Sequence, residues 1–173
     1  MSNELQLIVG IEMHCELKSN AKAFSKGING FSDTANVYVS PVDMAFPGTL
    51  PIVNKKCVGH AIKMAHILNC QIADVMQFDR KNYYYPVLPK GYQITQCTNP
   101  VGVNGKLEIP VDDKTLEVLI HDIHLEEDSA SLDHFAKMTT IDYNRAGVPL
   151  LEIVTEPCFS STKEVIAFLE YIR

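Results

Sequence analysis

The stretch TLEVLIHDIHLEED, residues 115–128, decides the fold of this 173-residue chain. Its aliphatic and β-branched residues predict a strand, and the alternation along 120–126 gives that strand two unlike faces: Asp122, His124 and Glu126 on one, Ile123 and Leu125 on the other. Asp112-Asp113 predicts a chain reversal before it, and Asn104-Gly105 predicts a hairpin turn earlier still. The middle of the chain is therefore expected to be an antiparallel meander.

Two further stretches alternate in the same way. LQLIVGIEMHCEL, residues 5–17, predicts a strand with Glu12, His14 and Glu16 on one face. VPLLEIVTE, residues 148–156, predicts another, with Glu152 and Glu156 on one face. If these strands are neighbours, their sheet carries an acidic patch that contains imidazoles.

Helices are expected on either side of this meander in the sequence. Asn54 is a plausible N-cap, followed by a buried stripe of Val58, Ile62, Ala65 and Leu68, with Asn69 at the end. Ser161 to Glu164 form a capping box before a second helix. The order of elements predicts an α+β domain, a largely antiparallel sheet with flanking helices, over residues 1–173. Since Arg173 ends that helix without a stop signal, we expect a fragment of a longer protein, truncated within a helix.

Composition excludes several classes of protein. The net charge of −6 means that this chain is not the main electrostatic anchor for a nucleic acid. The N-terminus lacks the pattern of a signal peptide and no apolar run is long enough to span a bilayer, so we expect a cytoplasmic protein without a membrane partner. Five scattered cysteines without CxxC spacing argue against a disulfide framework and a local zinc site.

The acidic strands are candidates for a metal site. Each strand alone is explained at least as well by a solvated sheet face. However, neither 10–17 nor 119–128 contains a lysine or arginine to compensate the acids. Carboxylates with an occasional imidazole suit Mg²⁺ or Mn²⁺ better than zinc. His121 falls on the apolar side by alternation and is not a candidate ligand.

A second candidate site is DRKNYYYPVLPKGYQ, residues 79–93. Lys81 and Lys90 lie among tyrosines such as Tyr83, and basic residues interleaved with aromatic rings can hold phosphates while a ring stacks on a base. An edge strand with protective lysines is an equally good interpretation of this stretch alone. The chain has no Walker A motif, which excludes a P-loop enzyme.

Four motifs resemble, in order, the N-terminal part of the B subunit of the glutamyl-/aspartyl-tRNA amidotransferases: VGIEMHCEL, FDRKNYYYPVLPKGYQI, HLEEDSA and DYNRAGVPLLEIVTEP. The resemblance implies a cradle-like catalytic domain similar in fold to glutamine synthetase. It also implies ATP-dependent, Mg²⁺-dependent phosphorylation of the side-chain carboxylate of Glu-tRNA(Gln) or Asp-tRNA(Asn). Ammonia channelled from the amidase A subunit then displaces the phosphate, in a complex that includes the small C subunit, and the tRNA acceptor end is bound there.

The resemblance also assigns residues. It implies metal ligands at Glu12, His14, Glu126, Glu127 and Glu152 and catalytic residues at Lys81, Lys90 and Arg145, the two lysines facing the phosphates of ATP. With Tyr83 of the tyrosine-rich stretch, these lysines are the expected ATP-binding residues. Alternation favours Glu126 over Glu127, since neighbours on a strand point apart. The isolated fragment is expected to be inactive. A non-catalytic scaffold for the partner subunits and tRNA, and a free-standing metal phosphatase, remain alternatives.

The early loop departs from the family pattern. Many members carry zinc-binding cysteines there, whereas this chain has Ser40-Pro-Val-Asp43 and Ser25-Lys-Gly27 in their place. No cysteine occurs between residues 16 and 56. We therefore predict no structural zinc.

Overall fold

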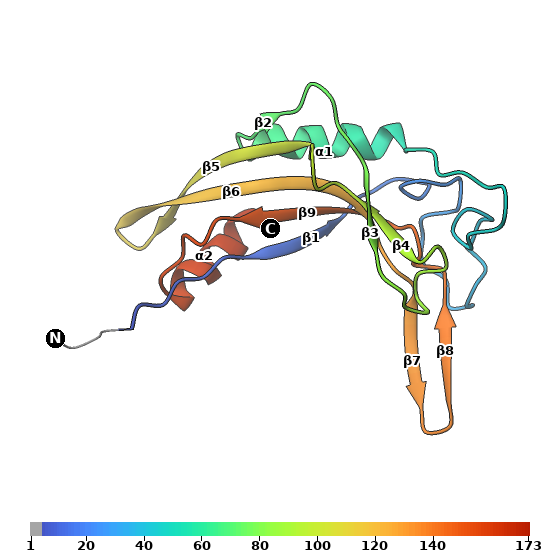
Figure 1. The fold of residues 1–173 in the computed structure, drawn as a ribbon. Coiled ribbons are helices and arrows are strands. Elements are labelled where there is room, and N and C mark those ends of the chain that lie inside the picture. Colours follow the sequence, from blue (N-terminus) through green and yellow to red (C-terminus); the bar gives the residue numbers. More distant parts are fainter. Residues whose placement is uncertain (1–4) are drawn as a thin grey trace.

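The computed structural model describes residues 5–173, built around a long, curved antiparallel sheet (Figure 1). Its five strands follow the order β1–β9–β6–β5–β2. They are β1 (Glu12–Glu16), β9 (Pro149–Thr155), β6 (Lys114–Glu127), β5 (Gly102–Val111) and β2 (Gln71–Ile72). The other described strands form two hairpins: β3 (Asp79–Asn82) with β4 (Tyr92–Thr95), and β7 (Ser131–Phe135) with β8 (Met138–Asp142). The β7–β8 hairpin projects away from the sheet (Figure 1).

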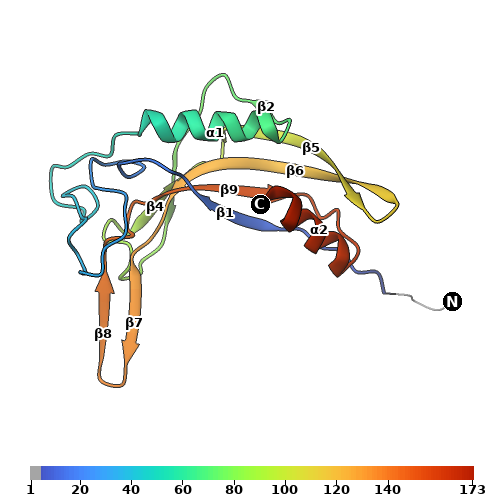
Figure 2. The same ribbon diagram turned by 180° about the vertical axis from the view of Figure 1, so that it is seen from behind.

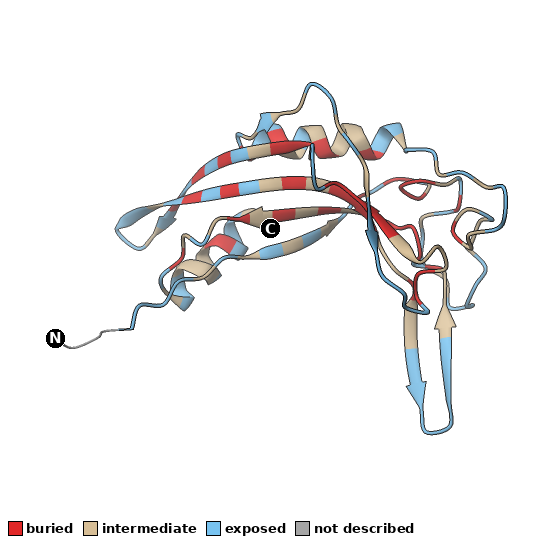
Figure 3. Cartoon of the chain, viewed as in Figure 1, coloured by how far each residue is buried: buried red, intermediate tan, exposed pale blue. Residues whose placement is uncertain are grey.

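Both helices, α1 (Lys55–Ile67) and α2 (Thr162–Ile172), pack on one face of this sheet (Figure 2). Cys57, Ala61 and Ala65 of α1 and Phe168 of α2 belong to the same apolar core as the inward residues of β6 and β9. Buried and exposed residues alternate along β5 and β6 as a half-buried sheet requires (Figure 3). The opposite face carries mainly polar side chains, and the predicted α+β class is confirmed.

The predicted helix starts are confirmed in atomic detail. The Asn54 side chain accepts a hydrogen bond from the backbone N–H of Lys56, and Ser161 Oγ accepts one from Glu164. The stripe of α1 differs from the prediction, because Cys57 and Ala61 are fully buried while Val58 and Ile62 are only partly buried. Small residues face the sheet here, so α1 approaches it closely.

Two sequence predictions about strands were wrong. The first strand was expected from residue 5, but β1 begins at Glu12 because its partner β9 ends at Thr155 and Pro157 follows. Asn104-Gly105 lies inside β5 rather than in a turn. A Cβ at Gly105 would lie 2.7 Å from the carbonyl oxygen of Leu68. The dipeptide therefore marks a close approach of the α1 C-terminus, while the predicted reversal at Asp112-Asp113 is confirmed.

A β-bulge in β6 decides which residues face outward. Ile120 pairs with Thr155 and Asp122 with Val154, so the β6–β9 register shifts by one residue at His121. Both His121 and Asp122 consequently point away from the core, whereas Val118, Ile120 and Ile123 point into it. Uninterrupted alternation had placed His121 on the apolar side, and this prediction was wrong because of the bulge.

A buried ion pair lies in the early loop, between β1 and α1. Lys22 Nζ lies 3.1 Å from Asp43 Oδ2, and neither side chain is more than 3% exposed. Asp43 also accepts a hydrogen bond from the backbone N–H of Ser40. A Cβ at Gly27 would lie 2.6 Å from Asp43 Oδ2, so glycine is needed beside the pair. The two segments that depart from the family pattern thus gather around Lys22 and Asp43.

Neither helix described has the length and apolarity needed to cross a membrane.

Candidate metal centre

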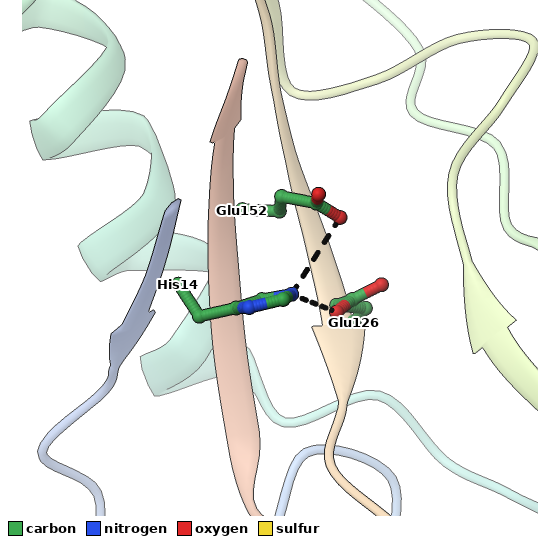
Figure 4. Close-up of side chains that lie close together, drawn as sticks. All are labelled: His14, Glu126 and Glu152. Atoms are coloured by element: carbon green, nitrogen blue, oxygen red, sulfur yellow. Dashed lines mark hydrogen bonds and ion pairs between the residues drawn. The ribbon is translucent and has the colours of Figure 1, made fainter. Parts of the chain in front are cut away.

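Three neighbouring strands bring polar side chains together on the open face of the sheet. His14 of β1, Glu152 of β9 and His124 of β6 are register partners across these strands. β9 lies between the other two strands, so β1 and β6 are not adjacent, yet a histidine side chain bridges the gap. His14 Nε2 lies 2.9 Å from Glu126 Oε1 and 3.7 Å from Glu152 Oε2 (Figure 4).

His14, Glu126 and Glu152 form a donor set suited to a divalent cation. One ligand atom from each lies within 4.8 Å of the other two. Two carboxylates and one imidazole nitrogen match the preferences of Mg²⁺ and Mn²⁺, with water or substrate oxygens filling the remaining positions. Glu126 is 3% exposed, whereas the His14 side chain is 52% exposed, so the centre has a buried floor and an open side.

Burial and mutual repulsion disfavour the charged forms of these acids. Burial raises the pKa of Glu126, the charge of Glu152 raises it further, and His124 and His14 offset only part of this. Burial opposes protonation of His124, but its hydrogen bond to Asp122 and the surrounding carboxylates outweigh that effect and raise its pKa. Such a set of mutually repelling acids is stabilised by positive charge.

The β3–β4 hairpin lies beside this centre. Thr95 Oγ1 of β4 donates a hydrogen bond to Glu126 Oε2 at 3.3 Å. Burial raises the pKa of Tyr83, and the charges of Glu126, Asp128 and Glu127 add to the effect, so its hydroxyl is within electrostatic range of these acids. Lys81 is exposed on β3. The hairpin therefore touches the metal centre through Thr95.

Glu127 and Lys90 pair with each other on the other side of β6. Lys90 Nζ lies 2.9 Å from one Glu127 carboxylate oxygen and 3.0 Å from the other, and Ile94 N–H also donates to Glu127. The structure thus separates Glu127 from Glu126, as alternation indicated. Glu127 does not belong to the cluster of His14, Glu126 and Glu152.

Glu12 and Arg145 lie at the edges of the site. Glu12 shares the outer face with His14 but aligns with Val154, one step along the sheet, and is not in the cluster. Arg145 is half-exposed and its Nε donates to Asp128 at 2.9 Å. A cavity of about 790 Å³ extends from Glu16 to Arg145, lined also by Lys18, Lys56 and Asn144.

Sequence reasoning missed the side chains that surround the ligands. His124 was expected on the metal face without a role, and Thr95 was not considered. Thr95 lies on a separate hairpin, so its contact with Glu126 could not be predicted from strand alternation. Its position just after the tyrosine-rich stretch was the one signal in the sequence. Asp122 and His124 carried a readable signal, since alternation put them on the face of Glu126.

Comparison with known proteins identifies the family. The family model described as "GatB/GatE catalytic domain" matches residues 7–173. The chain belongs to the GatB/GatE family. Among GatB relatives, it is 49% identical over 171 residues to the aspartyl/glutamyl-tRNA(Asn/Gln) amidotransferase B subunit of Mycoplasma mobile, covering 99% of this chain and 36% of that protein. The B subunit of Bacillus thuringiensis is 46% identical over 169 residues, covering 98% of this chain and 36% of that relative. This chain thus spans little more than a third of the length of these GatB proteins.

Proposed function

We propose that this chain is the part of a tRNA amidotransferase B subunit that activates the side-chain carboxylate of glutamate or aspartate carried on tRNA, using ATP. The names of the GatB relatives, aspartyl/glutamyl-tRNA(Asn/Gln) amidotransferases, support the class of substrate. The grouping of His14, Glu126 and Glu152 carries the proposal, because it supplies what phosphoryl transfer needs most, a site for a divalent cation.

The donor set fits Mg²⁺, which would be held by His14, Glu126 and Glu152. Glu12 is a further candidate ligand from the same face. When bound, the ion supplies charge neutralisation at the phosphate oxygens. The chain's own residues orient the reactants around it: the open side at His14 admits nucleotide, while Thr95 and the buried floor fix Glu126.

Residues of the β3–β4 hairpin are proposed to bind ATP. Lys81 is exposed and makes no ion pair among the described residues, so its ammonium is available for phosphate oxygens. The exposed ring of Tyr83 is proposed to stack on the base of ATP. Lys90 already forms an ion pair with Glu127, so its first proposed role is to hold the loop beside the metal centre. Its ammonium group can contact phosphate only after it separates from Glu127.

The proposed reaction has two steps. A side-chain carboxylate oxygen of the aminoacyl group attacks the γ-phosphorus of ATP, and the bond to ADP breaks with its electron pair leaving on ADP. Ammonia then attacks the acyl carbon, phosphate leaves, and the nitrogen loses a proton to give the amide. Arg145 and the lysines of the adjoining cavity are suited to the anionic groups of the substrate.

The remaining assignments follow the family. The amidase A subunit would supply the ammonia and the small C subunit would complete the complex, while the longer B subunit would bind the tRNA. The mainly antiparallel sheet with helices on one face is consistent with a glutamine synthetase-like cradle. The activity is therefore proposed for the complete amidotransferase, and we expect this chain alone to be inactive.

A single substitution tests the proposal. Glu126→Gln in the assembled amidotransferase keeps the shape of the side chain but removes a charged ligand, and we expect loss of ATP-dependent amidation and at least about tenfold weaker Mn²⁺ binding. Glu108→Gln, on the exposed face of β5, is the matched control and should change neither. A Glu126→Gln enzyme with normal amidation and Mn²⁺ affinity would instead indicate a scaffold that only docks its partners.

A further inference from the structure

Asp122 and His124 form a hydrogen-bonded support beneath one of the candidate ligands. His124 Nε2 lies 2.9 Å from Glu152 Oε2, and His124 Nδ1 lies 2.7 Å from Asp122 Oδ1. All three side chains are less than 20% exposed. Both nitrogens of one imidazole are thus engaged by carboxylates, which prevents the ring from turning.

Glu152 depends on this imidazole for its orientation. The same oxygen, Oε2, is 2.9 Å from His124 and 3.7 Å from His14, so the firmer contact comes from His124. Within the described residues, no backbone N–H or hydroxyl bonds this carboxylate. Without His124, rotation about the Glu152 side-chain bonds would be restrained only by the longer contact with His14.

The bulge at His121 makes the support possible. Val118 and Ile120 point into the core, so an unbroken strand would point Asp122 inward as well. The extra residue turns Asp122 outward and places it on the same face as His124 and Glu126. Bulges commonly re-aim a side chain next to a functional site.

We propose that Asp122 and His124 are positioning residues: they hold Glu152 in the orientation in which it binds the divalent cation together with His14 and Glu126. This inference rests on the proposed function, because it assigns a role toward the same metal centre. Histidine–carboxylate contacts that orient a ligand are as much part of a metal site as the ligands, and removing them typically weakens metal binding about 10- to 100-fold.

The test measures Mn²⁺ affinity in the assembled amidotransferase by electron paramagnetic resonance, which does not depend on turnover. We expect His124→Ala to weaken Mn²⁺ binding about 10- to 100-fold. His124→Gln, whose amide N–H can still donate to Glu152, should recover part of that loss. Asp122→Asn should weaken binding less than His124→Ala, because His124 remains in contact with Glu152.

The matched control is His66→Ala, which removes an exposed imidazole from α1, on the opposite face of the sheet from the metal centre. It should leave Mn²⁺ affinity unchanged. Thermal unfolding of each variant identifies any that fail to fold, in which case Asp122→Asn and His124→Gln, the milder changes, decide the question.

The outcomes separate the two proposals. If His124→Ala and Asp122→Asn bind Mn²⁺ as tightly as the unaltered complex while Glu126→Gln does not, the metal centre stands and the positioning role is overturned. If His124→Gln is no better than His124→Ala, the contact with Glu152 is not what matters and the inference also fails. If Glu126→Gln binds Mn²⁺ normally, the proposed function fails, and the inference with it.

Discussion

Lys90 Nζ bridges the two carboxylate oxygens of Glu127 at 2.9 and 3.0 Å, and the two side chains are only 9% and 3% exposed. The pair fastens the loop between β3 and β4 to the end of β6. Burial raises the pKa of Glu127, and the charge of Lys90, its hydrogen bond and the Ile94 N–H offset part of this rise. Lys90 and Glu127 are therefore first of all a structural link.

Breaking this link should destabilise the protein. We expect Lys90→Met or Glu127→Leu to lower the free energy of unfolding by about 3–5 kcal/mol, because each leaves one buried charge without its partner. The double variant Lys90→Met/Glu127→Leu should be less destabilised than the sum of the single variants. Urea denaturation of the chain measures all three, and single variants within about 0.5 kcal/mol of the unaltered protein would contradict the expectation.

Replacing Lys81 should affect ATP kinetics and leave stability unchanged. Its side chain is exposed, so Lys81→Met is expected to leave the melting temperature nearly unchanged. If it binds phosphate, the ATP-dependent step of the assembled enzyme should fall at least about tenfold in kcat/KM for ATP. Lys63→Met, on the exposed side of α1, is the control for removing a surface charge. Unchanged ATP kinetics would remove Lys81 from the site.

The early loop should be held by Lys22 and Asp43 rather than by a metal. Asp43→Ala leaves the Lys22 ammonium buried without a counter-charge, and we expect it to cost about 3–5 kcal/mol of unfolding free energy. Asp33→Ala, in an exposed part of the same loop, should cost little. We further expect a zinc-selective chelator, which leaves Mg²⁺ in place, to leave the melting temperature unchanged. A large decrease with this chelator would show that a bound zinc ion stabilises the loop.

A pH-dependent contribution is expected from His121 at the bulge. Its hydrogen bond to Glu156, at 2.7 Å, raises the pKa of His121, although burial opposes this, and the charges of Glu156 and Asp122 add to it. A raised pKa in the folded state stabilises the fold below the ordinary histidine value, and this stabilisation is lost as the pH rises through the raised value.

Glu156→Gln tests that sign. Since both side chains are substantially exposed, the effect should be small, about 0.2–1 kcal/mol. We expect the variant to melt lower than the unaltered chain near about pH 5, and at nearly the same temperature above about pH 9, where the imidazole is neutral in either protein. A decrease that is equal at both pH values would mean that the Glu156 contact does not act through the charge on His121.

Periodicity in the sequence accounts for much of the fold. The alternation of polar and apolar residues at 12–16, 122–126 and 150–155 follows from the two-sided geometry of a strand, and it placed His14, Glu126 and Glu152 each on the polar face of its own strand. Asn54 and Ser161 marked the helix starts, because their side chains satisfy N–H groups that any helix leaves free.

Outside the bulge at His121, the sequence by itself thus determined which side chains share a face of each strand, since that depends only on local backbone geometry. Tertiary structure alone decided the strand order β1–β9–β6, the bulge that turns His121 outward, and the pairing of Glu127 with Lys90 instead of with the metal ligands. These features depend on contacts between residues distant in the chain, where packing against α1 and the β3–β4 hairpin selects one arrangement among several that local patterns allow.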